Sequence, residues 1–99
     1  MTATATLVVT ARPNPEEMES VHAYLQGVMP PFVAASGTLV KRLKVDEVIT
    51  GSPVGMAMVT DFESADAISD LFASPEYAEL LPARDRGFAD MNILLTQQM

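Results

Sequence analysis

The chain has 99 residues, a formal net charge of -7 and no cysteine, and 48% of its residues are hydrophobic. This length predicts a single domain over residues 1–99, and the composition excludes both an intrinsically disordered chain and an apolar run of the ~20 residues that a membrane span needs. The charge argues against nucleic acid and anionic membranes as partners, and the absence of cysteine excludes disulfides and thiolate metal sites.

The N-terminal segment has neither a basic start nor a cleavage pattern, so we expect no secretory signal and a cytoplasmic protein. The Thr- and Val-rich run Thr4–Ala11 predicts a first strand, which Arg12-Pro13 ends. A helix is expected next, with Asn14 as its N-cap, Pro15 at the first helical position and Glu17 completing a capping box.

Apolar residues at spacings of three and four continue this helix beyond its first turn. Pro30-Pro31 predict a bend or a brief break, because neither residue has a backbone N–H to donate. Gly37 is expected to cap the helix at its C-terminal end.

Two strands are predicted next, Thr38–Val45 and Gly55–Phe62, with Val48-Ile49 as a possible continuation of the former and a turn between them. A second helix, split in two at Pro75, is expected before a last strand over Asp90–Gln97. The order β-α-β-β-α-β is that of an α+β, ferredoxin-like fold, with a four-stranded antiparallel sheet and the helices on one face.

Several of these strands are apolar on both faces. In the first strand, Val8 alternates with Leu7 and Val9, and in the third strand Val59 alternates with Met58. Helices on one side of the sheet leave the other face uncovered, and an identical sheet is the expected cover, which gives a two-fold homodimer. The alternative is a monomer with a rather apolar open face.

Three segments in order, Val59–Ser64, Ser74–Leu81 and Arg84, together with the opening Asn14-Pro15-Glu16, resemble the dimeric α/β-barrel superfamily. Within it, they resemble the domain of unknown function 1330 family, over nearly the whole chain. The resemblance implies a homodimer with a pocket but no agreed activity, since the superfamily holds monooxygenases, polyketide cyclases, isomerases, haem-degrading enzymes and plain ligand binders. A basic residue that the family usually has after the first helix is missing from Ser36-Gly37-Thr38.

Three residues are candidates for catalysis. His22 is the only histidine, and its spacing from Met18 and Leu25 predicts that it leans toward the buried side of its helix, as a general base. Tyr77 and Arg84 lie seven residues apart, two helical turns, where they would polarise a ligand oxygen. The alternatives are structural: a partly exposed histidine, a tyrosine packed under its helix, and an arginine paired with a carboxylate such as that of Asp61.

A second set of residues is expected to contact substrate. Asp61 lies on an otherwise apolar face and needs a partner, for which Arg42, Arg84 or a ligand would serve, with a salt bridge the favoured arrangement. Aromatic and thioether side chains suit an adaptable apolar pocket. The candidates for substrate binding are Arg42, Asp61, Tyr24, Met58 and Phe72.

These features favour a homodimer that binds a small apolar, aromatic or polyketide-like metabolite and performs cofactor-independent proton transfer on it, as a cyclase, isomerase or dehydratase does. A non-catalytic ligand-binding or structural dimer is the first alternative, and a cofactor-free monooxygenase is the second. No cofactor and no metal is expected, because one histidine and a carboxylate are too few for a zinc site.

Overall fold

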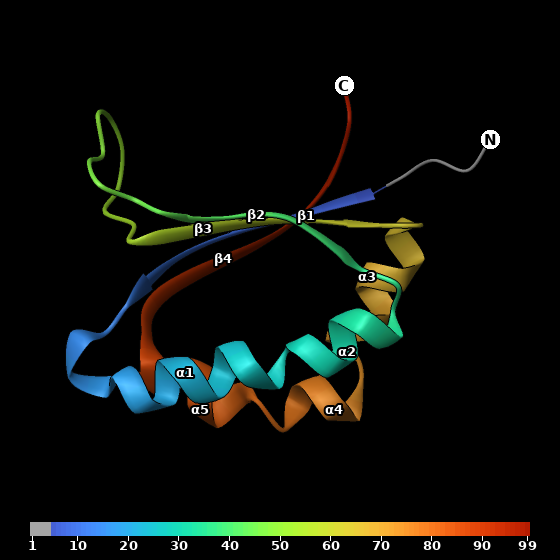
Figure 1. The fold of residues 1–99 in the computed structure, drawn as a ribbon, viewed down its shortest axis with the longest axis horizontal. Coiled ribbons are helices and arrows are strands. Elements are labelled where there is room, and N and C mark those ends of the chain that lie inside the picture. The colour runs from blue at the N-terminus through green and yellow to red at the C-terminus, as the bar shows by residue number, and fades with distance from the viewer. Residues whose placement is uncertain (1–4) are drawn as a thin grey trace.

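A four-stranded antiparallel sheet packed against a layer of helices makes up the computed structural model, which describes residues 5–99 (Figure 1). The strand order β2-β3-β1-β4 confirms the ferredoxin-like α+β fold. Thr4, the expected start of the first strand, lies outside the described residues. The elements are β1 (Ala5–Pro13), η1 (Pro15–Glu17), α1 (Met18–Gly27), α2 (Met29–Ala34), β2 (Thr38–Lys44), β3 (Met56–Phe62), α3 (Ala65–Phe72), α4 (Pro75–Ala78), α5 (Leu81–Gly87) and β4 (Phe88–Gln97).

The helical layer begins at Asn14, whose Oδ1 accepts a hydrogen bond from the backbone N–H of Glu16 at 3.0 Å. The expected capping box with Glu17 does not form, because the backbone N–H of Asn14 donates instead to the carbonyl of Gly87 at 2.8 Å. The helix breaks at Val28, before the two prolines, which occupy the first turn of α2, where no N–H is needed. None of the helices within residues 5–99 is long and apolar enough to cross a membrane.

The turn from α2 into β2 differs from the expected glycine cap. Ser36, not Gly37, takes the left-handed conformation, with φ of 63°. Gly37 is needed for a close approach instead, because a Cβ there would lie 2.8 Å from the ring of Phe62. The expected strand continuation at Val48-Ile49 is likewise wrong, since both residues belong to the loop between β2 and β3.

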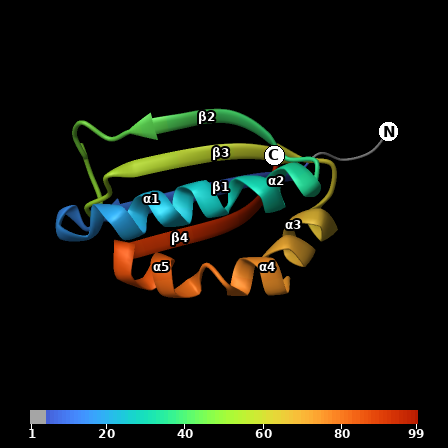
Figure 2. The ribbon, with the colours of Figure 1, turned by 60° about the horizontal axis from the view of Figure 1, so that its bottom comes forward.

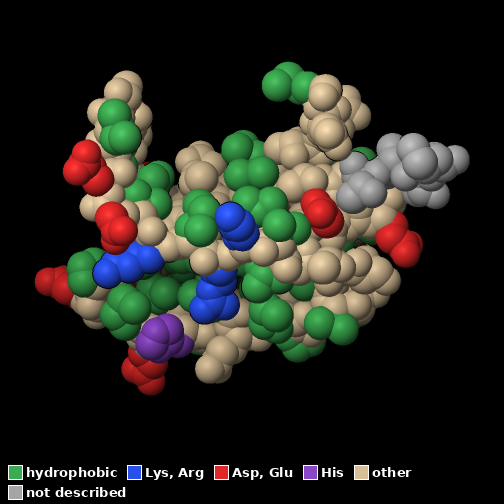
Figure 3. All heavy atoms as spheres, turned by 45° about the horizontal axis from the view of Figure 1, so that its top comes forward, with side chains coloured by type: hydrophobic (Ala, Val, Ile, Leu, Met, Phe, Trp, Pro, Cys, Tyr) green, Lys and Arg blue, Asp and Glu red, His purple; other side chains and the backbone are tan. Residues whose placement is uncertain are grey.

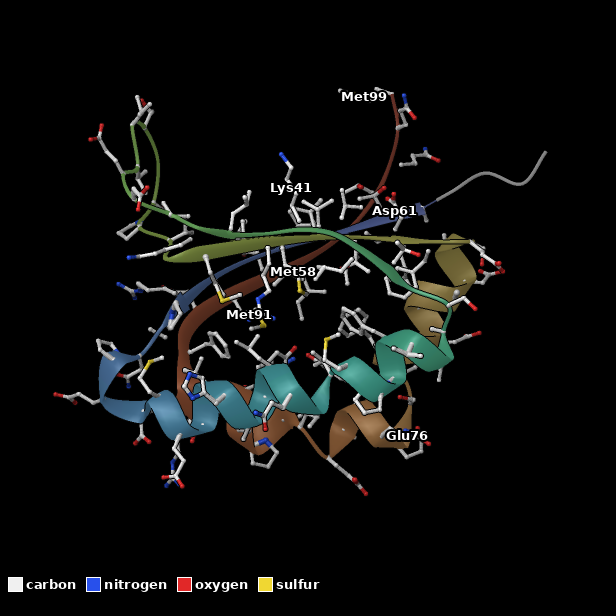
Figure 4. All side chains as sticks on the ribbon, viewed as in Figure 1. Lys41, Met58, Asp61, Glu76, Met91 and Met99 are labelled. Carbon is white, nitrogen blue, oxygen red and sulfur yellow. The ribbon has the colours of Figure 1, made fainter. Side chains whose placement is uncertain are left out.

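The core lies between the sheet and the helices, as the alternation in the strands predicted. Leu7 is fully buried there, whereas Val8 faces the opposite side and is half-buried. Figure 4 shows Met58 and Met91 pointing from the sheet toward the helices, and Lys41 and Asp61 pointing away from them. Figure 2 shows the helices lying together on this one side of the sheet.

The other side of the sheet, here called the open face, carries no helix. Across it run Leu94, Val8 and Val59, which the strand register places side by side. Leu43 and Leu94 remain 46% and 48% exposed. In Figure 3, hydrophobic side chains gather on this face among a few basic ones. The β2–β3 loop and the C-terminal end rise beside it at opposite ends (Figure 1).

The edge strand β2 is exposed along its whole length. Its pairing with β3 shifts register between Leu39 and Lys41, which marks a β-bulge. Three of its seven residues are basic, Lys41, Arg42 and Lys44.

Candidate functional site

Two buried tyrosines meet inside the helical layer. Tyr24 of α1 and Tyr77 of α4 are 5% and 3% exposed, and their hydroxyl oxygens share a hydrogen bond of 2.8 Å. The rings pack edge to face, with Phe88 against Tyr24 and Phe72 against Tyr77 at centroid distances of 5.5 and 4.7 Å. This packing fixes the position of both hydroxyl groups.

Arg84 joins the tyrosine pair to the surface. Its Nη1 donates a hydrogen bond to the Tyr77 hydroxyl at 3.2 Å, and its Nε donates to Asp85 at the same distance. The guanidinium also lies 5.9 Å from the centroid of the Tyr77 ring. Tyr77 and Arg84 therefore lie together as expected, although on two helices, α4 and α5, rather than one. The side chain of Arg84 keeps 29% of its surface exposed.

Burial sets the protonation state of this cluster. It raises the pKa of Tyr24 well above its usual range, and the hydrogen bond with Tyr77 raises that pKa further. The phenol of Tyr24 consequently keeps its proton at neutral pH. Tyr24 therefore offers no phenolate base there.

Stability should therefore fall in alkaline solution. A tyrosine in the unfolded chain ionises at pH ~10, whereas folded Tyr24 resists ionisation. The contribution of this difference to the free energy of unfolding is therefore full below that pH. Above it, the free energy of unfolding falls by up to ~1.4 kcal/mol per pH unit. Urea unfolding at pH 9, 10 and 11 measures the slope. Tyr24→Phe should flatten it, and an equal slope in both proteins would contradict this assignment.

A hollow of about 340 Å³ opens between α5 and the beginning of β4. Arg84 and Asp85 line it from the helix, and apolar side chains, among them Met91 and Ile93, line it from the strand. At its rim, Asp90 accepts a hydrogen bond of 2.7 Å from Arg12. The volume lies within the range of small-molecule sites.

Two of the other predicted residues differ from expectation. His22 is exposed, so it does not lean toward the buried side of α1, and it does not line the hollow. Asp61 forms no salt bridge with Arg42 or Arg84; its Oδ1 accepts a hydrogen bond of 2.7 Å from the hydroxyl of Thr6 instead. A neutral neighbour on the adjacent strand satisfies the carboxylate, and Arg42 stays exposed on the edge strand.

The predicted apolar contacts divide between the site and the core. Tyr24 is hydrogen-bonded to Tyr77, and Phe72 packs edge to face against the ring of Tyr77. Met58 is 6% exposed in the core. Neither Met58 nor Phe72 lines the hollow.

Sequence reasoning missed most of the hollow's lining. In the sequence, the lining residues look only like an acidic surface or an apolar strand. They come together because α5 packs beside β4, and they are Asp85, Asp90, Met91 and Ile93. Residues 5–99 hold no group of three His, Cys, Asp or Glu side chains placed to bind a metal ion.

This sheet order and helix layer define a ferredoxin-like α+β domain with a hollow between its last helix and last strand. The chain belongs to the family described as Domain of unknown function (DUF1330), whose model matches residues 6–99. None of the curated proteins matches the sequence.

Solved structures support the same fold. A protein of unknown function from Rhodopseudomonas palustris is 15% identical, with a TM-score of 0.83 over 100% of this chain and 85% of its own. A dimeric protein of unknown function with a ferredoxin-like fold from Bacteroides fragilis is 10% identical, with a TM-score of 0.64 over 96% of each chain. An uncharacterised NIPSNAP-like domain protein from Burkholderia xenovorans is 13% identical, with a TM-score of 0.66 over 100% of this chain and 88% of its own.

Proposed function

We propose that the protein is a homodimeric small-molecule-binding protein, whose ligand places a carboxylate or enolate oxygen on Arg84 in the hollow between α5 and β4. The observation that carries this proposal is the position of Arg84. One side of its guanidinium is held by the buried hydroxyl of Tyr77, and the same side chain lines the hollow.

The remaining donors of Arg84 are available to a ligand. A guanidinium has five N–H groups, of which Tyr77 and Asp85 take one each. The others form the planar fork that suits a pair of oxygens. Most of the hollow's surface is polar, and Met91 and Ile93 add a smaller apolar part, so the ligand expected is a small anion with a short apolar or aromatic body.

The open face supports the homodimer. A row of Leu94, Val8 and Val59 on an uncovered sheet is the kind of apolar surface that monomers rarely leave in water. The same face on a second copy is a self-complementary partner related by a two-fold axis. A structural neighbour, the Bacteroides fragilis protein, is dimeric.

Cofactor-independent chemistry on such a ligand would begin with polarisation of its oxygen by Arg84. The Tyr77 hydroxyl, which is hydrogen-bonded to Tyr24, holds the guanidinium in place. Proton transfer also needs a base within reach, and the carboxylates in the hollow are Asp85 and Asp90, each held by an arginine. Binding and polarisation are the functions that the geometry supports best.

Benzoate and the neutral benzyl alcohol form a matched pair of probes for this site. In NMR titrations, benzoate should shift the amide resonances of Arg84, Met91 and Ile93, and benzyl alcohol should bind at least ~10-fold more weakly, because a charge-assisted hydrogen bond contributes more than ~1.4 kcal/mol. Arg84→Gln should remove this preference for the anion.

Arg86→Gln is the control, since Arg86 is an exposed neighbour on the same helix and does not line the hollow. Its titration should match that of the unmodified protein. Equal binding of the two probes, or an Arg84→Gln protein that binds benzoate normally, would refute the proposed site.

A further inference from the structure

A second and larger hollow lies on the outer surface of the helical layer, away from Arg84. It measures about 680 Å³ and is lined by residues of α2 on one side and of α3 and α4 on the other. Figure 2 shows where these three helices lie in the helical layer. Small side chains line the gap, Ala34 and Ala67 on the facing helices and Ala35 just after α2, and they leave it open because they do not reach across it. Leu71, which is 5% exposed, and Leu80 give it an apolar lining.

The charged groups of this groove are all of one sign. Asp70, Glu76 and Glu79 line it, and no lysine, arginine or histidine does. None of the three carboxylates takes part in a salt bridge within residues 5–99. All three are exposed, and they lie beside the apolar lining of the groove.

We infer that this groove binds a small amphiphilic cation, an ammonium or guanidinium group on an apolar body. The apolar lining would bury the body, and the unpaired carboxylates would hold the cation. The volume is that of a small-molecule site. The chemistry is opposite to that of the Arg84 hollow, and the two sites share no lining residue, so each stands or fails separately.

Three probes of nearly equal shape test the charge preference: phenethylammonium, the neutral 2-phenylethanol and the anionic 3-phenylpropionate. In NMR titrations of the full chain, phenethylammonium should shift the methyl resonances of Ala34, Ala67 and Leu80. It should bind at least ~10-fold more tightly than 2-phenylethanol at low salt, and higher ionic strength should weaken it. The anion should not shift these resonances.

The double variant Glu76→Gln, Glu79→Gln keeps the side-chain length at two exposed positions. It should lower the affinity for phenethylammonium at least fivefold and leave the affinity for 2-phenylethanol unchanged. Glu47→Gln, in the β2–β3 loop and outside the groove, is the matched control and should have no effect. Shifts that fall elsewhere, equal affinity for amine and alcohol, or an unaffected double variant would each overturn the inference.

Discussion

Replacing Val8 with aspartate should convert the proposed homodimer into a monomer. Val8 lies between Val59 and Leu94 in the middle of the open face, so a carboxylate there would be buried without a partner in the interface. Two-fold symmetry doubles the penalty. At ~3 kcal/mol for each unpaired charge, the dissociation constant should rise by roughly four orders of magnitude.

Analytical ultracentrifugation over a range of protein concentrations measures this change. Leu94→Asp, at a position already 48% exposed, repeats the test without disturbing the monomer's core. Val33→Asp is the matched control, because Val33 is 67% exposed on α2, outside the open face, and should leave the dimer intact. An unmodified protein that sediments as a monomer, or Val8→Asp and Leu94→Asp proteins that both remain dimeric, would contradict the proposed assembly.

Truncating Tyr77 should have the largest effect on stability of any change at the site. Tyr77→Ala removes a buried ring that packs against Tyr24 and Phe72, and such truncations lower the free energy of unfolding by about 3–5 kcal/mol. Tyr77→Phe keeps the ring but removes the hydrogen-bond partner of the Tyr24 hydroxyl, which should lower the free energy of unfolding by about 1–3 kcal/mol. Urea unfolding at pH 7 measures both.

A double-mutant cycle separates the hydroxyl pair from its surroundings. Because Tyr24→Phe and Tyr77→Phe remove the two ends of one hydrogen bond, the double variant should be less destabilised than the sum of the single variants, by at least ~0.5 kcal/mol. Additive effects would indicate that the hydroxyl groups are not coupled. The control combines Tyr77→Phe with Thr10→Val, a change at a distant position on the open face. The effects of these two changes on the free energy of unfolding should add.

Local sequence patterns were sufficient to predict the fold. The alternation around Leu7 and Val8 and the prolines that open α2 and α4 depend on residues close to them in the chain. The order of elements along the chain was predicted from such patterns, and the bare sheet face followed from the topology that this order implies. Errors arose where a distant segment decides the outcome. Gly87 takes the N–H of Asn14 that was expected for a capping box, and the ring of Phe62 explains Gly37.

The candidate site was predictable only in part, for the same reason. The seven-residue spacing of Tyr77 and Arg84 correctly predicted that they lie together, even though the helix breaks between them. The partner of Tyr77 was not visible in any spacing, because Tyr24 lies 53 residues away in the chain. His22 was misplaced because α1 turns its Val21 and Tyr24 inward, and the two residues between them face water.

The bulged edge strand β2 limits how far the sheet can grow. An exposed edge presents unpaired backbone groups to any passing strand, which is how sheets polymerise into fibres. Here the bulge at Leu39–Lys41 distorts the regular spacing of those groups, and three basic side chains along seven residues repel a second copy of the same strand. Association through the open face is thus compatible with an assembly that stops at two subunits and remains in solution at high concentration.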